Sequence, residues 1–466
     1  MEFYKNDINL KLKSSYNMID TDVNNEITEV LFNMIKSFDD VKQNDIDKID
    51  FFRDLIDIIN KNSEAINSHV FLVNDFEMEI YQMFMEPTFG LSEILLKVLS
   101  LITMYKLVCD IYIQETKLFD LCIGMLGNVG NLNTINLVFK IMINLIPSFI
   151  EKNDINFLPF ETVRSTSLPY NILKFITTTL LYDDESFDHI LKYIDIVNEV
   201  LEKIDLQDED NVYELFKFLY LSVHSNISNA FYIFNEQYND EDHFYSSPLF
   251  DLIYEHYNDF KSNDTITIYL LSFCIDILKS SQKSSKFILS KNINVDLLLD
   301  IIKNNQNSDI IWRALSTLKY LIYNSTRESN TKETEYDNII PNSFYCLENL
   351  EYFCNLLNDS PYNLCIIIII IIFNFVYEGD NSFILYLIDI NFISNLYTFY
   401  LSEPFKVSFF ILFILEKSKQ LYPKRVQLIA NQILNLGIIE ESKELNDEDL
   451  KLVIHKIKQL IEEILN

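Results

Sequence analysis

Apolar residues recur at intervals of three and four along most of the chain, and polar clusters or single prolines interrupt them. This spacing gathers apolar side chains on one face of an α-helix, so the pattern predicts one helix after another and no convincing strand. The last helix is the clearest, with Asn446 as its expected N-cap and acidic residues in its first turn. Its apolar stripe comprises Leu450, Val453, Ile454, Ile457, Leu460, Ile461 and Ile464. One apolar and one polar face suit the last unit of a stacked array, and a partner-binding helix is the alternative.

Turn-forming residues are scarce, with six glycines and nine prolines among 466 residues. Sandwiches, barrels and Rossmann folds need more of them, so the composition predicts an all-α fold. We expect an armadillo/HEAT-like right-handed superhelical solenoid. Residues 26–466 are predicted to form one such domain after a weakly structured N-terminus at 1–25. The polar segments near 235–248 and 324–343 are expected to be loops that protrude from the array.

Two runs of the sequence are almost wholly apolar, residues 364–376 and residues 409–415. A membrane-spanning helix needs about 20 apolar residues, so both runs are too short for that. They are instead predicted to be core helices that neighbouring helices cover on all sides. No membrane association is therefore expected.

Three of the six glycines, Gly124, Gly127 and Gly130, lie within seven residues, in a segment that otherwise has helical spacing. Glycine in a helix interior costs roughly 1 kcal/mol relative to alanine, so this spacing predicts a bare face against which a neighbouring backbone packs closely. An open face available for binding is the alternative.

The same segment, Cys122-Ile123-Gly124-Met125-Leu126-Gly127-Asn128, resembles the core of an armadillo-type repeat. In particular it is similar to the Cys-Val-Gly-Ile-Leu-Gly-Asn string of the serum amyloid A-like protein 1 family, which is armadillo-like. The resemblance implies a non-enzymatic interaction scaffold in the nucleus or cytoplasm that is linked to cell proliferation, without catalytic residues. Its structural signature here would be Cys122, Gly124, Leu126, Gly127, Asn128 and Gly130.

A second resemblance is to importin alpha, whose armadillo repeats share the Leu-Gly-Asn segment and whose acidic groove accepts basic nuclear-localisation peptides. Aligned on it, Asn128, Tyr320 and Asn374 would point into a concave groove that holds a protein partner or peptide. The tryptophans of that family are missing here, since Gly124, Ser316 and Ile370 stand at the corresponding places. We therefore expect only weak, salt-sensitive binding of basic peptides.

The formal net charge is −32, which would repel a nucleic-acid backbone, and no basic stripe offsets it. We therefore expect no direct nucleic-acid binding. The first 20 residues lack the apolar core of a signal peptide, and the six cysteines are scattered without a Cys-x-x-Cys pair. These features predict free thiols in an intracellular, reducing compartment.

No motif for a catalytic or cofactor site occurs: the sequence lacks His-Glu-x-x-His, Gly-x-Ser-x-Gly, a P-loop and a dinucleotide fingerprint. The six histidines are far apart, which gives no reason to expect a metal site. We predict that the protein is not an enzyme and needs no cofactor, while the sequence leaves its oligomeric state open.

Overall fold

The computed structural model describes residues 26–41, 44–86, 91–128, 131–183, 186–225, 257, 259, 261–280, 295–328, 340–400, 402–441 and 447–465. These residues are helical or lie in turns, and none of them is in a strand, so the prediction of an all-α fold is confirmed. The chain divides into two compact units, Met1–Phe273 (unit 1) and Cys274–Asn466 (unit 2).

The described helices of unit 1 are α2 (Glu26–Lys36), α3 (Phe38–Val41), α4 (Asp45–Asn62), η1 (Ser63–Ala65), η2 (Ser68–Asp75), α5 (Phe76–Met85), α6 (Ser92–Ile102), α7 (Lys106–Glu115), α8 (Leu118–Asn128), α9 (Leu132–Ile150), η3 (Ile155–Phe157), α10 (Phe160–Arg164), α11 (Pro169–Tyr182), α12 (Ser186–Leu201) and α13 (Glu209–Ser225). Helix α16 (Asp264–Ser280) contains the boundary between the units.

The described helices of unit 2 that follow are α18 (Val295–Asn304), α19 (Ser308–Glu328), η4 (Asn342–Phe344), α20 (Leu347–Asp359), α21 (Tyr362–Glu378), α22 (Ser382–Asp389), α23 (Phe392–Tyr397), α24 (Pro404–Leu421), α25 (Pro423–Leu436), α26 (Ile438–Glu441) and α27 (Glu448–Leu465).

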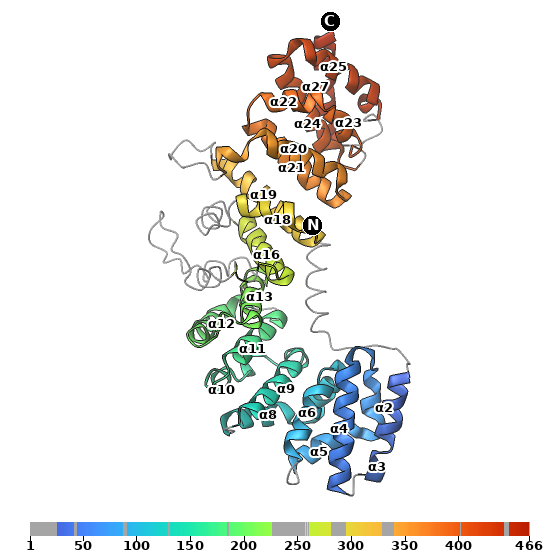
Figure 1. The fold of residues 1–466 in the computed structure, drawn as a ribbon, viewed down its shortest axis with the longest axis vertical. Coiled ribbons are helices and arrows are strands. Elements are labelled where there is room, and N and C mark those ends of the chain that lie inside the picture. The colour runs from blue at the N-terminus through green and yellow to red at the C-terminus, as the bar shows by residue number, and fades with distance from the viewer. Residues whose placement is uncertain are drawn as a thin grey trace. The chain divides into compact units, whose positions relative to one another are not determined.

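In unit 1 the core lies along a succession of helices in which each packs against the next: α4, α6, α9, α11 and α13 (Figure 1). Helix α9 also contacts α7 and α8, and it buries ten of its residues. In length and composition α9 is the one described helix that could cross a membrane, and a mostly buried core helix meets the same criteria.

In unit 2, α21 packs against α19 and α20, while α24 packs against α27 and α25.

Several hydrogen bonds between helices join residues 35 to 46 positions apart, in both units. Six such pairs are Thr28 and Asn67, Ser63 and Tyr105, Ser100 and Asn144, Asn136 and Asn171, Leu278 and Asn324, and Asn381 and Tyr422. Other hydrogen bonds between helices span longer separations, such as Tyr352 to Ile302, 50 positions apart.

Some predicted boundaries need correction. Helix α27 begins at Glu448, and the preceding Asp447 caps it by accepting a hydrogen bond from the backbone N–H of Leu450 (3.1 Å). Asn446, the expected cap, lies outside the described residues. The apolar stripe of α27 is buried as predicted, with Leu460 half-buried.

The predicted polar loop at 324–343 starts too early, because α19 continues to Glu328 and residues 342–344 form η4. Residues 1–25 and the predicted loop at 235–248 lie outside the described residues.

Candidate functional site

Most of the glycine-rich segment lies in α8, and its two described glycines, Gly124 and Gly127, do not contact another helix closely. Gly124 and Gly127 are exposed, and a Cβ atom added to either would meet nothing within 4 Å. Cys122 and Leu126, one helical turn apart, are the buried residues of this segment, and burial raises the pKa of the Cys122 thiol to about 12. The prediction of a tight glycine face is therefore wrong for both glycines, because the face that packs inward is the one marked by Cys122 and Leu126.

Two other members of the predicted set, Gly130 and the side chain of Asn128, lie outside the described part of the structure. The remaining predicted groove residues, Tyr320 and Asn374, lie on α19 and α21 of unit 2, two helices that pack against each other. Asn374 is half-buried, and its side-chain amide donates to the carbonyl of Ile370 within the same helix (2.7 Å).

Helices α21 and α24 correspond to the two apolar runs, and neither is covered on all sides as predicted. On α21 a stripe of partly exposed residues runs along the helix at intervals of three and four: Ile366, Ile370, Phe373 and Tyr377. On α24 a second stripe consists of Phe405, Phe409 and Phe413. Tyr377 is 50% exposed, Phe409 46% and Phe405 40%, so large aromatic side chains face solvent on both helices.

The two stripes meet through ring contacts. The Phe373 ring lies 5.9 Å from the Phe409 ring and 5.2 Å from the Phe413 ring, measured between centroids. The Tyr377 ring lies 5.7 Å from that of Phe413, and Phe405 stacks on Phe409 at 6.3 Å. These side chains therefore form one continuous aromatic surface across α21 and α24.

Lysines border this surface. At one end the Lys417 ammonium lies 5.6 Å from the centre of the Phe413 ring. Lys319 of α19 and Lys279 of α16 place their ammonium groups 4.2 Å and 5.9 Å from the centre of the Tyr320 ring. The charge of Lys406, which follows Phe405 on α24, helps to lower the pKa of Lys319, so these lysines lie near the α24 stripe. Burial, together with the charge of Asp276, raises the pKa of Tyr320.

We call this surface the aromatic–lysine face of unit 2; it consists of Lys279, Lys319, Tyr320, Phe373, Tyr377, Phe405, Lys406, Phe409, Phe413 and Lys417.

Unit 1 contains a related cluster that is buried. Lys217 of α13 is fully buried and Glu214 nearly so, with 3.9 Å between the ammonium nitrogen and a carboxylate oxygen. The Lys217 ammonium lies 5.7 Å from the centre of the Tyr213 ring, whose hydroxyl is 3.4 Å from that of Tyr269. Burial lowers the pKa of Lys217 to about 8, and the Glu214 charge partly opposes this shift. We call these residues the tyrosine–lysine cluster of unit 1.

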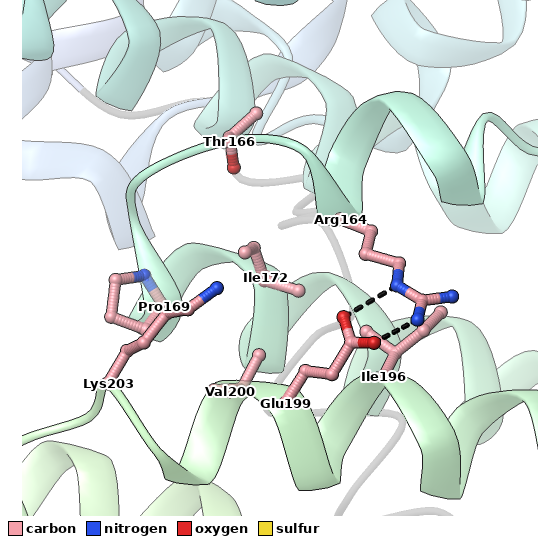
Figure 2. A pocket seen from close by; sticks show the side chains of 8 residues that line it. All are labelled: Arg164, Thr166, Pro169, Ile172, Ile196, Glu199, Val200 and Lys203. Atoms are coloured by element: carbon pink, nitrogen blue, oxygen red, sulfur yellow. Dashed lines mark hydrogen bonds and ion pairs between the residues drawn. The ribbon is translucent and has the colours of Figure 1, made fainter.

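A shallow hollow in unit 1 lies between α10, α11 and α12 (Figure 2). Arg164 forms two hydrogen bonds with Glu199 on its rim, one of them of 2.6 Å between the Arg164 Nε and a carboxylate oxygen. The remaining lining is mainly apolar and includes Ile172, Ile196 and Val200. Because Arg164 and Glu199 satisfy each other, they offer a ligand little uncompensated charge.

No family model matches the chain, and no curated protein matches it significantly. Among solved structures, it is similar to an engineered protein whose crystal structure comes from the Northeast Structural Genomics Consortium. The TM-score is 0.59 at 10% sequence identity, and the alignment covers 94% of this chain and 99% of that one. At this identity the similarity concerns the fold alone.

The sequence pointed to Tyr320 and Asn374 as groove residues, a prediction that stays untested, and the aromatic stripes on α21 and α24 were not predicted. The signal was present, since Phe405, Phe409 and Phe413 recur every four residues and therefore share one face of a helix. A wholly apolar run does not reveal which of its faces lacks a cover, so the aromatic spacing was the better guide.

Proposed function

We propose that this protein is a non-enzymatic helical-repeat scaffold that binds a segment of a partner protein on the aromatic–lysine face of unit 2. The observation that carries the proposal is the pair of exposed aromatic stripes on α21 and α24. Isolated exposed apolar residues are ordinary, whereas contiguous ones mark interaction sites.

The chemistry of the surface supports binding of a protein segment. Phenylalanine and tyrosine have few rotatable bonds and a large apolar area, so they lose little entropy when a partner covers them. Such residues dominate the binding energy of protein interfaces when they lie at the centre of the contact. Phe373, Phe409 and Phe413 contact one another and so present a preformed platform.

Two features of the fold support a repeat protein of the armadillo or HEAT type. Successive layers pack in order along unit 1, and hydrogen bonds link positions 35 to 46 residues apart. Armadillo and HEAT repeats have similar lengths, and arrays of them form extended surfaces that bind partners. On this basis we propose the right-handed solenoid expected from the sequence.

We also propose kinship with the serum amyloid A-like protein 1 family, on the basis of the residues of α8. This kinship would imply a nuclear or cytoplasmic location and a link to proliferation.

The alternative, an importin-alpha-like adaptor for basic peptides, has less support. Basic peptides need acidic groups and tryptophan faces in the groove, but Tyr320 has two lysine ammonium groups over its ring. Like charges across an interface suppress binding, so this face disfavours a lysine-rich ligand.

The proposal can be tested by affinity purification from the native organism followed by mass spectrometry, using the intact chain and a Tyr377→Ser/Phe409→Ser variant. We expect at least one protein to be retained by the intact chain and lost from the variant. The matched control is Leu428→Ser, which removes an exposed apolar residue (67% exposed) from α25. Identical partner sets for all three proteins would contradict the proposal.

A further inference from the structure

The lysines at the α19 end of the aromatic–lysine face are crowded together. Lys279 and Lys319 both approach the Tyr320 ring. Lys279 pairs with Asp276 (3.1 Å) and Lys406 with Glu403 (2.8 Å), each on its own helix. Among the described residues Lys319 forms no ion pair.

The electrostatics of Lys319 point the same way. Burial lowers its pKa, and the charges of Lys279 and Lys406 lower it further. A half-buried ammonium group in such surroundings is stabilised when an anion approaches, because the anion offsets both the lost hydration and the repulsion. At the α24 end Lys417 also lacks an ion-pair partner within the described part of the chain.

The molecule carries a net charge of −32, and carboxylates also lie at this face, since Asp276 and Glu403 each pair with one of its lysines. Lys319 and Lys417, which form no ion pair among the described residues, favour a ligand that brings carboxylates, by charge complementarity. The exposed rings between the lysines require large apolar groups on the same ligand.

From this arrangement we propose that the aromatic–lysine face of unit 2 binds an acidic protein segment whose large apolar side chains rest on Phe373, Tyr377 and Phe409 while its carboxylates reach Lys319 and Lys417. This inference rests on the proposed function and specifies the chemistry of the partner. An amphipathic helix provides this combination, since apolar residues three and four positions apart share one face and carboxylates can flank them.

Single-stranded nucleic acid is the other ligand with negative charges and flat apolar groups. It is disfavoured because nucleic-acid binding depends on many phosphate contacts, whereas this face has four lysines, two of them paired with carboxylates.

The test uses the full chain and fluorescence anisotropy with four labelled probes. The first is a synthetic amphipathic peptide with leucine and phenylalanine on one face and glutamate on its flanks. The second has lysine in place of every glutamate, the third has serine in place of every apolar residue, and the fourth is a short oligothymidylate. We expect measurable binding of the first probe alone, weakening as salt rises.

Variants then locate the site. We expect Lys319→Glu and Phe409→Ser each to weaken binding of the first peptide by about tenfold or more, since one reverses a charge contact and the other removes an anchor. Lys424→Glu makes the same charge change at an exposed lysine of α25 and should leave affinity unchanged. Lys319→Gln is a milder second variant, and circular dichroism verifies that each variant folds.

The possible results separate the inference from the proposed function. If the lysine peptide binds as well as the glutamate peptide and Phe409→Ser weakens both, the acidic assignment is overturned while the face remains a protein-binding surface. Tighter binding of the oligothymidylate would overturn the assignment to protein. If no probe binds, the acidic-segment inference is overturned, and the partner set of Tyr377→Ser/Phe409→Ser decides the proposed function independently.

Discussion

Both units place lysine ammonium groups beside tyrosine rings, but they differ in how much solvent reaches the charge. In unit 1, Lys217 is fully buried next to Tyr213, and a carboxylate of Glu214 lies 3.9 Å away. In unit 2, Lys319 lies over Tyr320 at the edge of an exposed aromatic surface, and its charged neighbours are lysines. The same residue types therefore serve the interior of one unit and a surface of the other.

The physical cost of a charge explains what this difference means. A buried ammonium group loses its hydration and is tolerated only when a nearby carboxylate and polar groups compensate for it. Lys217 has its compensation within the unit, so it contributes to the fold and has little left to offer a ligand. Lys319 keeps part of its hydration and lacks a carboxylate partner among the described residues, which makes it available to a ligand.

The largest expected effect comes from breaking the buried pair in unit 1. Glu214→Gln should lower the free energy of unfolding by about 3–5 kcal/mol near pH 7, because it leaves the Lys217 ammonium group buried without this carboxylate. The double variant Lys217→Met/Glu214→Gln should recover most of that loss, since it removes both charges. Urea denaturation of the two variants and of the intact chain measures this.

The matched control in unit 2 is Lys319→Met, which should change stability by less than about 1 kcal/mol because the group is partly exposed and unpaired. An equal loss in Glu214→Gln and Lys319→Met would remove the distinction between the two clusters.

The pH dependence of stability tests the same cluster with a somewhat smaller effect. Burial lowers the pKa of Lys217 from 10.5 to about 8. Between these values the unfolded chain holds the Lys217 proton more fully than the folded chain. The free energy of unfolding therefore rises with pH from about 8 to 10.5, and the gain is lost when the pH is lowered back to 8. The full gap corresponds to about 3 kcal/mol. Denaturation from pH 7.5 to 10 should show this rise in the intact chain but not in Lys217→Met, and parallel profiles would contradict it.

A glycine in unit 2 provides the third test. Gly379 ends α21, the helix that carries Tyr377, and a Cβ atom there would overlap the Phe383 ring and the carbonyl oxygen of Phe375. Gly379→Ala should therefore lower the free energy of unfolding by about 1–3 kcal/mol, the usual range for forcing an added carbon into a packed site. Thermal denaturation measures the loss. No change in melting temperature would mean that the end of α21 rearranges freely.

Much of the helical pattern could be predicted from the spacing of apolar residues, because apolar residues three and four positions apart mark the buried face of a helix. The final helix is the best example, since its apolar stripe is buried as expected. The spacing does not show whether an apolar helix face is covered by another helix of the chain or left exposed. The run at 364–376 indicated a fully enclosed helix, yet Phe373 remains half-exposed and Tyr377, just beyond the run, is exposed. A partner outside the chain leaves the same apolar signal in the sequence as a neighbouring helix inside it.

The candidate site was predicted in part for a similar reason. Tyr320 and Asn374 were chosen by alignment to armadillo repeats, which indicates helix faces but not the residues that occupy the next helix. Lys319 and Lys406 come from different helices, and their proximity depends on tertiary packing that a single sequence does not contain. The glycines of α8 misled for the opposite reason, since glycine permits a close contact without requiring one.

The smallest expected effect has the opposite sign and concerns those glycines in unit 1. Gly124→Ala should raise the free energy of unfolding by about 0.5–1 kcal/mol, because alanine favours the helix and its Cβ atom would contact nothing within 4 Å. Gly127→Leu should likewise be tolerated, where a tight glycine contact would make it strongly destabilising. Melting temperatures of both variants, compared with that of Gly379→Ala, measure the contrast. A loss of stability in Gly124→Ala and Gly127→Leu would mean that this face of α8 packs closely after all. The glycines of α8 would then resemble Gly379, where an added Cβ atom overlaps neighbouring atoms.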